Sequence, residues 1–377
     1  MKKKIIRVST VPGSLNSFLE GFLKKLSEDY EVIALSSPGP TLDKLALREG
    51  VRTIAIPMER HISILKDIIS LIRLIIVFAK ERPDIVHSMT PKAGLLSMLA
   101  AWVTRVPVRI HTFTGLVFPT AVGFKRKILM FMDGLTCACA TYVNPESKGV
   151  ANDLKNFGIT KKDLHIIANG NVRGVNMSQY DRTPEVLNKA SELRNKECTT
   201  FCFVGRLVGD KGINELVSAF DKLFKEHSNI RLFLVGARED NLDPLKDKTL
   251  DIISKNKNIH CWGIQEDIRP FLAASDIFVF PSYREGMPNV VLEAGALGLP
   301  SIVTDINGSN EIIINGKNGV IIPPKDELAL LQVMKEWCLS PEKVKIMALN
   351  SRRLVESRYE QKLIWNALLE EYNNLLK

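Results

Sequence analysis

Two glutamates, Glu285 and Glu293, stand eight residues apart in the segment SYREGMPNVVLEAGALGLPSI, residues 282–302. The stretch around Glu293 is too apolar for a solvent-exposed helix face, so solvation or lysine pairing explains the two carboxylates poorly. A carboxylate can accept hydrogen bonds from two neighbouring hydroxyls, such as those of a ribose. We therefore interpret Glu293 as a ribose-binding residue and Glu285 as a group that reaches toward a second polyol.

The residues between these glutamates predict a seat for a phosphate. A helix is expected from about Pro288 to Leu297, because proline suits a first helical turn and Gly298 suits the position after a helix. The free N–H groups of its first turn, near Met287 to Val290, would then favour an anion. The segment thus combines two sugar-binding carboxylates with one anion-binding helix end.

Two cations precede a second predicted helix in FVGRLVGDKGINEL. Arg206 comes directly after a predicted strand, and Lys211 precedes a helix that we expect to open at about Gly212. Two positive side chains beside a helix N-terminus can neutralise a diphosphate. The competing interpretation is a pair of solvated loop charges.

The first strand-to-helix loop, TVPGSLNSFLEG, carries a weaker signal. Gly13 would let the backbone approach a ligand closely, and a helix is expected to open near Asn16. A dinucleotide-binding fingerprint would need G-x-G-x-x-G here and an acidic residue after the second strand. Both are absent, which argues against a dehydrogenase.

A histidine is predicted near the ligand as well. His111, in RIHTFTG, is placed after a strand in a ligand-facing loop, and His87, inside DIVHSM, is its competitor. A lone histidine at a strand end is more often a local hydrogen-bonding group than a catalyst, so both roles are open.

Strand-like and helix-like patterns alternate twice along the 377 residues. Strands with nearly continuous apolar character predict parallel sheets covered on both faces, hence an α/β fold with two Rossmann-like domains. We assign residues 1–178 to the first domain, 179–360 to the second and 361–377 to a final helix that is free to pack back on the first. Ligands of such sheets bind beyond the strands' carboxyl ends, and we expect them in a cleft between the domains. The predicted strands cover residues 4–10, 31–37, 84–89, 108–114 and 141–145 of the first domain and the segments TTFCFVGRL, IRLFLVGA, NIHCWG, DIFVFPS, PSIVT and GVIIPP of the second.

Composition is ordinary for a globular protein, with 45% hydrophobic and 25% charged residues. The most apolar stretch, residues 68–80, contains Arg73 and is too short to span a membrane, and the basic N-terminus has no signal-like apolar region. We therefore expect a cytoplasmic chain. The six cysteines show no C-x-x-C spacing, so we interpret them as small buried hydrophobes without a metal or redox role.

The net charge of +9 is unevenly distributed. Residues 1–178 carry 25 Lys and Arg against 14 Asp and Glu, whereas residues 179–377 carry 26 against 28. The first half therefore suits an anionic partner, either a membrane surface, a phosphorylated lipid or a nucleic acid, unless the cations merely solvate it. No nucleic-acid-binding motif accompanies the charge, so we expect no nucleic acid.

Three consecutive cations, Lys125, Arg126 and Lys127, adjoin a strongly apolar predicted helix. Such a combination suits an interfacial helix or a site for a lipid diphosphate. The alternative is a core helix with a basic first turn.

The motifs together resemble the retaining family-4 glycosyltransferases of GT-B fold. An E-x7-E segment follows a strand, and G-R-L-x-x-x-K-G stands about 80 residues before it. Four segments stand in the order typical of the family: FVGRLVGDKG, LFLVGARED, the Glu285–Glu293 segment and NGKNGVIIPP. The likeness covers essentially the whole chain. Departures at Gly13-Ser14, at Arg173 and Asn176, and at ARED concern the choice of sugar and acceptor.

The resemblance implies a role for each matching residue. Arg206 and Lys211 would hold the nucleotide diphosphate, and Glu293 would hold the ribose. His111 would occupy the family's cleft-histidine position, and on this resemblance we assign catalytic roles to His111 and Glu285. Backbone near Ile264 would contact the nucleobase. The donor sugar would be bound by Glu285 and by the residues that follow it, which are Gly286, Met287, Pro288, Asn289 and Val290.

We therefore predict transfer of a glycosyl group from a nucleotide diphosphate sugar, by resemblance a UDP-sugar, with retention. The acceptor would be a hydroxyl of a glycan or of a polyprenyl-diphosphate-linked glycan, met at the inner face of the membrane. No cofactor or metal is expected, since no D-x-D motif follows a strand. Two alternatives stay open: a nucleotide-sugar epimerase of the same fold, and a non-catalytic module that binds anions or lipid head groups.

Overall fold

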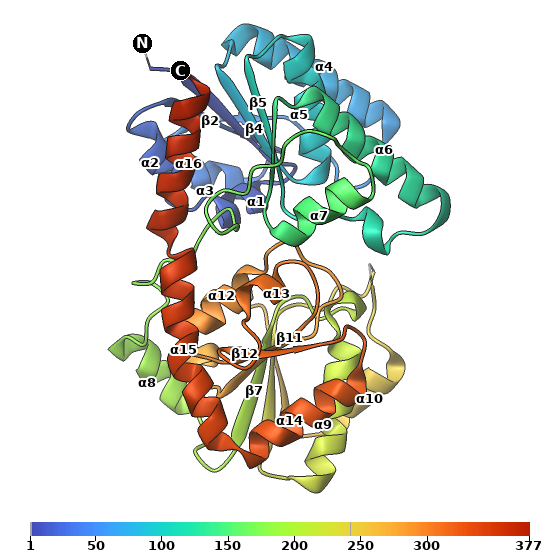
Figure 1. Ribbon diagram of the computed structural model, residues 1–377, viewed down its shortest axis with the longest axis vertical. Helices are drawn as coiled ribbons and strands as arrows, with labels where there is room; N and C mark the ends of the chain where they lie inside the picture. The colour runs from blue at the N-terminus through green and yellow to red at the C-terminus, as the bar shows by residue number, and fades with distance from the viewer. Residues whose placement is uncertain (1, 242) are drawn as a thin grey trace. The chain divides into compact units, whose positions relative to one another are not determined.

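The computed structural model describes residues 2–241 and 243–377. The chain forms two compact units (Figure 1). Unit 1 comprises Met1–Arg173 and Lys362–Lys377, and unit 2 comprises Gly174–Gln361. The first domain is predicted to end at residue 178, whereas residues 174–178 belong to unit 2. Most of the last helix belongs to unit 1.

Unit 1 is built on a six-stranded parallel sheet in the order β3-β2-β1-β4-β5-β6. The order reverses between β1 and β4, and open sheets bind ligands beyond the carboxyl ends of the strands at such a switch point. The strands are β1 (Lys4–Val8), β2 (Glu31–Ser36), β3 (Arg52–Ala55), β4 (Ile85–Met89), β5 (Val108–Phe113) and β6 (Tyr142–Pro145).

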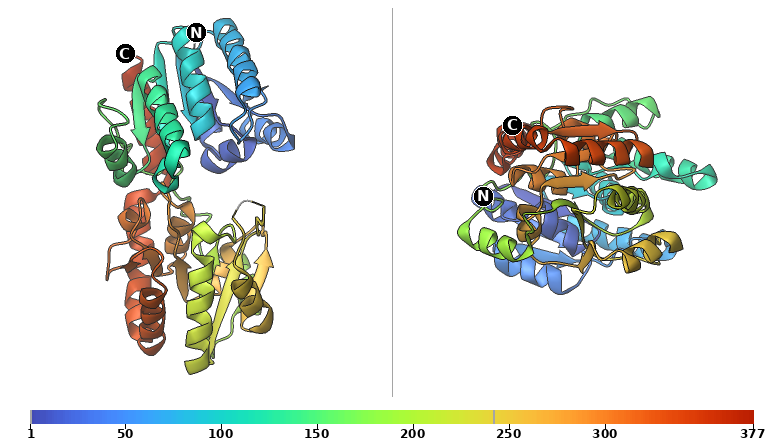
Figure 2. Two further views of the ribbon diagram at one scale, coloured as in Figure 1. Left: turned by 90° about the vertical axis from the view of Figure 1, so that its right-hand side faces the viewer. Right: turned by 90° about the horizontal axis from the view of Figure 1, so that it is seen from below.

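Helices cover both faces of this sheet because alternate strand residues are apolar on each side. Ile6, Val8 and Val86 pack into one core cluster, and Ile5 and Ile85 pack into another on the opposite face. Helices α4, α5 and α6 lie side by side on the first face (Figure 1, Figure 2). The helices are α1 (Pro12–Phe18), α2 (Phe22–Ser27), α3 (Pro40–Glu49), α4 (Ile64–Glu81), α5 (Pro91–Val103), α6 (Gly123–Cys139), α7 (Lys148–Asn156) and α16 (Gln361–Leu375), with a 3₁₀ turn η1 (Phe118–Thr120).

The last helix, α16, completes the second face of unit 1. Trp365 packs on Phe22 of α2 with ring centroids 5.7 Å apart, and Leu368 and Tyr372 enter the core cluster of that face. Figure 1 shows α16 beside α2. The chain therefore returns to its N-terminal unit to cover apolar surface that α1 to α3 leave open.

Unit 2 repeats the same plan with the order β12-β11-β10-β7-β8-β9, again entirely parallel. All six predicted strands of this half are present, because each is a short apolar run bounded by turn residues. They are β7 (Thr199–Val204), β8 (Ile230–Val235), β9 (Ile259–Gly263), β10 (Ile277–Phe280), β11 (Ser301–Thr304) and β12 (Gly319–Ile322).

Helices again cover the sheet of unit 2, and its aromatic core includes Phe203 and Phe280, which stack at 5.8 Å. Among the helices of the described residues, none combines the length and apolar character that a bilayer crossing requires. The helices of unit 2 are α8 (Pro184–Leu193), α9 (Ile213–Glu226), α10 (Asp247–Lys255), α11 (Arg269–Ala273), α12 (Asn289–Ala296), α13 (Ser309–Ile312), α14 (Glu327–Leu339) and α15 (Pro341–Tyr359), with a 3₁₀ turn η2 (Gly209–Lys211).

Candidate active site

The loop between β7 and α9 carries both predicted diphosphate ligands, Arg206 and Lys211. Gly212 caps α9, as the sequence predicts, with φ of 70°. A Cβ atom at this position would overlap the carbonyl oxygen of Pro281, so only glycine allows the approach. The loop after β7 therefore lies directly against the loop after β10, at the carboxyl edge of the unit 2 sheet.

The approach of these loops joins Lys211 to Glu285. Lys211 Nζ forms an ion pair with Glu285 Oε1, and the two side chains are only 14% and 17% exposed. Ser282 Oγ donates to the same oxygen at 2.8 Å, and Lys211 Nζ lies 5.5 Å from the centre of the Phe280 ring. The structure thus brings the residue predicted to bind the diphosphate and the residue predicted to bind the sugar into one contact. The sequence argument against lysine pairing is therefore wrong for Glu285, because Lys211 reaches it from a neighbouring loop.

Arg206 is oriented by a residue that the sequence analysis did not single out. Its Nη1 donates to Glu239 Oε2 at 2.7 Å, and Glu239 belongs to the loop after β8. Partial burial acts to lower the pKa of Arg206, but the hydrogen bond and negative charge of Glu239 raise that pKa above its ordinary value. Arg206 is therefore a permanent cation at the carboxyl edge, held by a neighbouring loop.

Helix α12 opens beside this ion pair. Pro288 is its N-cap and Asn289 its first residue, so α12 begins one residue later than the sequence predicts. The helix ends at Ala296, and Gly298 follows with φ of 78°. The predicted donor-binding residues Gly286 to Val290 therefore form the turn that enters α12 and the start of the helix itself, where partial positive charge accumulates.

Glu293 lies on the fifth position of α12 and is only 6% exposed. Its Oε1 accepts a hydrogen bond from the Tyr180 hydroxyl at 2.8 Å. Tyr180 stands in a polar segment just after the predicted domain boundary at residue 178, and no periodicity there marks it as a site residue. The buried carboxylate is therefore held in one orientation by a phenol from a distant part of the chain.

Ile264 follows β9 directly, and its side chain is 79% exposed. Because the strand order runs β10-β7-β8-β9, the loops that carry Glu285, Arg206, Glu239 and Ile264 follow one another along a single edge. Parallel strands end at the same edge, so this proximity is a direct result of the topology. The edge can accommodate an elongated anionic ligand that has hydroxyl groups.

In unit 1, the predicted opening of the first helix near Asn16 is wrong. Helix α1 begins at Pro12 after the N-cap Val11, so Gly13 lies in its first turn rather than in a loop. A Cβ atom on Gly13 would meet nothing within 4 Å. Gly13 therefore stands at the carboxyl edge of β1 with open space beside it, and its predicted contact with a donor is not tested by this geometry.

The predicted position of His111 in a loop after a strand is also wrong. His111 is instead the fourth residue of β5, inside the strand predicted over residues 108–114, and it is buried. Its Nδ1 lies 2.8 Å from Ser88 Oγ, and its ring packs so closely on Gly94 of α5 that a Cβ there would overlap the imidazole. Burial lowers the pKa of His111 to about 3, so the imidazole is neutral near pH 7. His111 therefore has the environment of a structural residue.

The cations Lys125, Arg126 and Lys127 lie in the first turn of α6, which begins at Gly123. The Arg126 guanidinium lies 5.1 Å from the centre of the Phe157 ring, so this cation packs on an aromatic surface. Lys125 and Lys127 are exposed. The basic first turn is confirmed, whereas its contact with an acceptor or a membrane stays a prediction.

Known families match both halves of the chain. Residues 186–354 match the family "Glycosyl transferases group 1", and residues 22–170 match the "Glycosyl transferase 4-like domain". The capsular polysaccharide biosynthesis glycosyltransferase CapM of Staphylococcus aureus is 30% identical over 379 residues, which cover 100% of this chain and 98% of CapM. This chain is a family-4 glycosyltransferase.

The glycosyltransferase has the GT-B fold of its structural neighbours. Anabaena HepE, solved in complex with UDP, superposes with a TM-score of 0.81 over 99% of this chain and 100% of its own, at 17% identity. A second relative, the Escherichia coli UDP-Gal:α-D-GlcNAc-diphosphoundecaprenol α-1,3-galactosyltransferase, is 30% identical over 346 residues, covering 86% of this chain and 85% of the relative.

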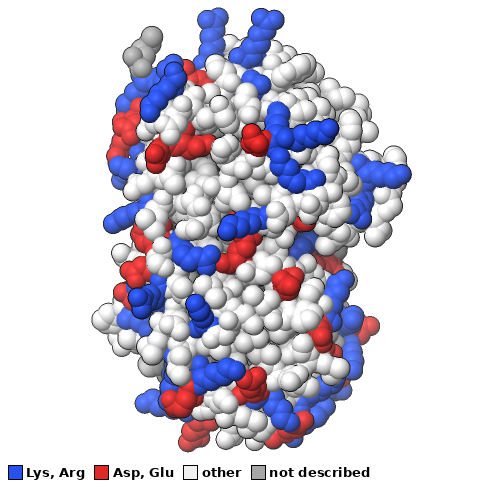
Figure 3. Space-filling view, in the orientation of Figure 1, with Lys and Arg blue, Asp and Glu red and all other residues white. Residues whose placement is uncertain are grey.

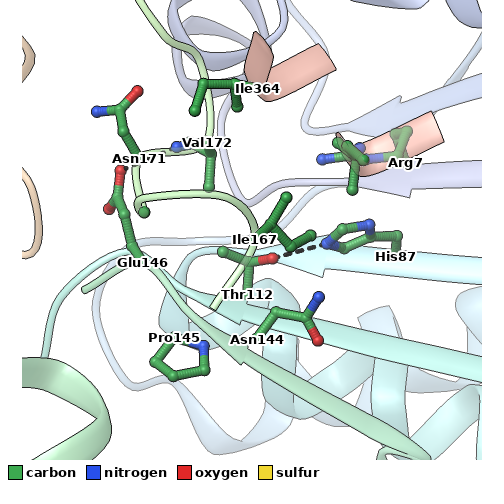
Figure 4. Close-up of a pocket in the computed structure, with 12 residues that line it drawn as sticks. Arg7, His87, Thr112, Asn144, Pro145, Glu146, Ile167, Asn171, Val172 and Ile364 are labelled. Atoms are coloured by element: carbon green, nitrogen blue, oxygen red, sulfur yellow. Dashed lines mark hydrogen bonds between the residues drawn. The ribbon is translucent and has the colours of Figure 1, made fainter. Parts of the chain in front are cut away.

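Unit 1 of the glycosyltransferase contains a small cavity, lined by both polar and apolar residues, that has no counterpart among the predicted sites (Figure 4). Its volume of about 20 Å³ is room for about one water molecule. Arg7 and His87 share the Tyr372 hydroxyl of α16, at 2.6 Å each, and His87 Nε2 lies 2.7 Å from Thr112 Oγ1. Asn144 lines the cavity with both side-chain polar atoms unpartnered.

The contacts beside this cavity indicate the role of His87, the alternative candidate to His111 for a ligand-binding histidine. Burial, the Arg7 charge and the His111 ring lower the pKa of His87 well below its ordinary value. Its two ring nitrogens are both engaged within the core. His87 therefore joins α16 to the sheet, and its sequence signal, a polar residue within a buried strand, reflects that structural contact.

Proposed function

We propose that this glycosyltransferase moves a hexosyl or N-acetylhexosaminyl group from a UDP-sugar to a hydroxyl of a glycan or polyprenyl-diphosphate-linked acceptor. The transfer retains the configuration at the anomeric carbon and requires no metal ion. The UDP complex of HepE supports the choice of nucleotide, and the diphosphoundecaprenol-linked substrate in the name of the E. coli relative supports the choice of acceptor.

The reaction exchanges one bond at the anomeric carbon for another. The bond from this carbon to the diphosphate oxygen breaks and a bond to the acceptor oxygen forms. The proton of the acceptor hydroxyl ends on the released UDP or in the solvent. Negative charge grows on the departing diphosphate, so fixed positive groups aimed at it lower the barrier. In our proposal these groups are Arg206, Lys211 and the N-terminal end of α12.

The contact between Lys211 and Glu285 carries this proposal. In this contact the cation proposed for the diphosphate lies beside the carboxylate proposed for the sugar, and the bond that breaks joins those two parts of the donor. Glu285 and the turn from Gly286 to Val290 would orient the sugar. Glu293 would accept hydrogen bonds from the ribose, and backbone near Ile264 would meet the uracil.

The acceptor part of the proposal concerns the membrane. A polyprenyl-diphosphate-linked glycan is anchored in a bilayer, so an enzyme that uses it must reach the membrane surface. We propose peripheral binding on the cytoplasmic side, with Lys125 and Lys127 of α6 near the anionic surface or the lipid diphosphate.

An acceptor screen tests the function directly. The protein is incubated with each of several UDP-sugars and a polyprenyl-diphosphate-linked N-acetylhexosamine, and UDP release is measured with and without the acceptor. We expect release that depends on the acceptor, a product whose anomeric configuration matches the donor by NMR, and unchanged rates in EDTA. Release of an epimerised free sugar without acceptor would instead identify an epimerase.

A further inference from the structure

Helix α4 has two apolar faces, and only one of them is used by the fold. Ser70, Leu74 and Phe78 are buried against unit 1. Six large aliphatic side chains on the remaining surface of the same helix are between 49% and 77% exposed. They are Ile64, Leu65, Ile68, Ile69, Ile72 and Ile76.

The spacing of the exposed residues makes them one surface rather than scattered positions. Leu65, Ile69, Ile72 and Ile76 follow each other at intervals of four, three and four residues, which places them along one side of a helix. Single exposed apolar residues are normal on soluble proteins, but a contiguous row of them marks a contact surface. We call these six residues the outer face of α4.

Cations border the outer face. The two acidic residues of α4 are both engaged in ion pairs on the protein side: Asp67 with Lys92 at 2.7 Å, and Glu81 with Lys4 at 3.0 Å. Arg73 and Lys80 are exposed. Lys66 is paired with Glu59. A row of exposed apolar residues bordered by positive side chains is complementary to a lipid bilayer that has anionic head groups and an apolar interior.

The charge of the whole unit has the same sign. Unit 1 carries 27 Lys and Arg against 16 Asp and Glu, a net charge of +11. Figure 3 shows mostly uncharged surface at its upper right, over α4 and α5, where the charged side chains are mainly Lys and Arg. Long-range attraction to anionic lipids would therefore act on the unit that bears the outer face.

The outer face is continuous with the carboxyl edge of the unit 1 sheet. Helices that follow parallel strands begin at that edge, so Ile64 and Leu65 of α4 and Phe124 and Lys125 of α6 lie at the same end of the unit, with α5 between them. Phe124 is exposed as well. Lipid contact along α4 would bring the ligand-binding edge of the sheet to the membrane surface.

We propose that the outer face of α4 is the membrane-binding surface of this protein and lies on a bilayer that contains anionic lipids. The aliphatic side chains enter the region between head groups and acyl chains, and Arg73 and Lys80 remain at the head groups. The biological reason, access to a lipid-linked acceptor, rests on the proposed function. The binding itself does not depend on catalysis.

Sedimentation with vesicles tests the proposal. The full-length protein is mixed with vesicles of phosphatidylglycerol and phosphatidylcholine, or of phosphatidylcholine alone, without donor or acceptor. We expect binding to the mixed vesicles, weakened by salt. The triple variant Leu65→Ser, Ile69→Ser, Ile72→Ser should bind about tenfold or more weakly. A control variant with three exposed aliphatic residues of unit 2 replaced, Leu328→Ser, Ile346→Ser and Leu349→Ser, should bind like the wild type, although these residues are 62% to 79% exposed.

Three outcomes would overturn the proposal. One is wild-type protein that stays in solution with both vesicles, and another is a triple variant that binds as tightly as wild type. The third is a wild-type dimer, seen by light scattering, that the α4 variant converts to a monomer without any vesicle binding, because the face would then serve a second copy. A thermal unfolding curve of each variant, recorded without ligand, shows whether both units remain folded, because the α4 substitutions lie in unit 1. A failure of the transfer assay leaves the vesicle result unaffected.

Discussion

Lys211 and Glu285 meet although 74 residues separate them in the chain. Each occupies a loop at the carboxyl end of a neighbouring strand, β7 and β10, and each is largely shielded from water. A carboxylate that neutralises a lysine in a polar pocket also restrains that lysine in one position. The ion pair therefore holds Lys211, the residue proposed to bind the diphosphate, in position before the donor binds.

Replacement of Lys211 by alanine removes one of the two side-chain cations proposed for the departing diphosphate. We expect kcat to fall by about 10² to 10³, the range measured when one group that stabilises developing charge is deleted. Steady-state UDP release measures the effect. Lys255→Ala, which removes an exposed lysine of α10, serves as the control and should leave kcat unchanged. A Lys211→Ala enzyme with wild-type turnover would remove this residue from the mechanism.

Replacement of Tyr180 by phenylalanine tests whether Glu293 must be oriented. The variant loses the hydroxyl that donates to Glu293 Oε1, a net loss of about 1 kcal/mol for one hydrogen bond, so we expect KM for the donor to rise by about fivefold with little change in kcat. Isothermal titration with UDP gives the matching affinity. Tyr142→Phe, in unit 1, is the control. Equal donor affinity in all three proteins would show that Tyr180 has no part in donor binding.

Replacement of Gly212 by alanine should separate the loops that carry Lys211 and Glu285. In Gly212→Ala the added Cβ overlaps Pro281, and alanine must also adopt a left-handed backbone conformation. In Gly316→Ala only the left-handed conformation is unfavourable, because nothing lies within 4 Å of the added Cβ. We expect the free energy of unfolding to fall by about 1 kcal/mol in Gly316→Ala and by about 3 kcal/mol in Gly212→Ala. Urea denaturation measures both, and equal losses would show that the contact with Pro281 relaxes easily.

Acidification should destabilise unit 1 through His111. Its pKa is about 3 in the folded protein and about 6.5 when unfolded, so the unfolded chain binds a proton that the folded one does not. The stabilising contribution is complete above about pH 6.5 and is lost as the pH falls toward 3, by about 2 kcal/mol between about pH 7 and about pH 5. Urea denaturation at both pH values measures this loss of unfolding free energy. In His111→Gln the loss between the two pH values should be smaller than in the wild type by about 2 kcal/mol.

The same His111→Gln variant separates a structural from a catalytic role. Glutamine can keep the hydrogen bond to Ser88 but cannot serve as an imidazole base. We expect turnover within about threefold of wild type, since the histidine is enclosed in β5 and α5. A loss of about 10² or more with unchanged stability would restore the catalytic assignment made from the sequence.

Removal of the Tyr372 hydroxyl should loosen α16. Tyr372→Phe leaves Arg7 Nη1 and His87 Nδ1 without their shared partner inside the core, which costs about 2 kcal/mol of unfolding free energy. Hydrogen exchange of α16 amides should rise accordingly, and Tyr142→Phe again supplies the control. Unaltered protection of α16 would show that its apolar contacts, led by Trp365 and Leu368, are sufficient.

The sequence predicted the sheets well and their edges less well. The inner strands of unit 2, β7, β8, β10 and β11, are visible as apolar runs, because a strand buried on both faces tolerates few polar residues. Strand β3 is absent from the predictions, since it lies at a sheet edge and none of its four residues is fully buried. The first helix was placed too late because Gly13 and Ser14 resemble a loop, although Pro12 suits the first turn of a helix.

By itself the sequence determined the fold class, the family and the residues proposed for the diphosphate and the ribose, because these depend on local order: a strand, a glycine turn and a helix start. Only the tertiary structure decided which side chains meet. Tyr180 with Glu293, Glu239 with Arg206, and Tyr372 with Arg7 are pairs from separate elements, and no periodicity records such contacts. Burial likewise follows from packing, which is why a histidine expected in a loop proved to be enclosed between a strand and a helix.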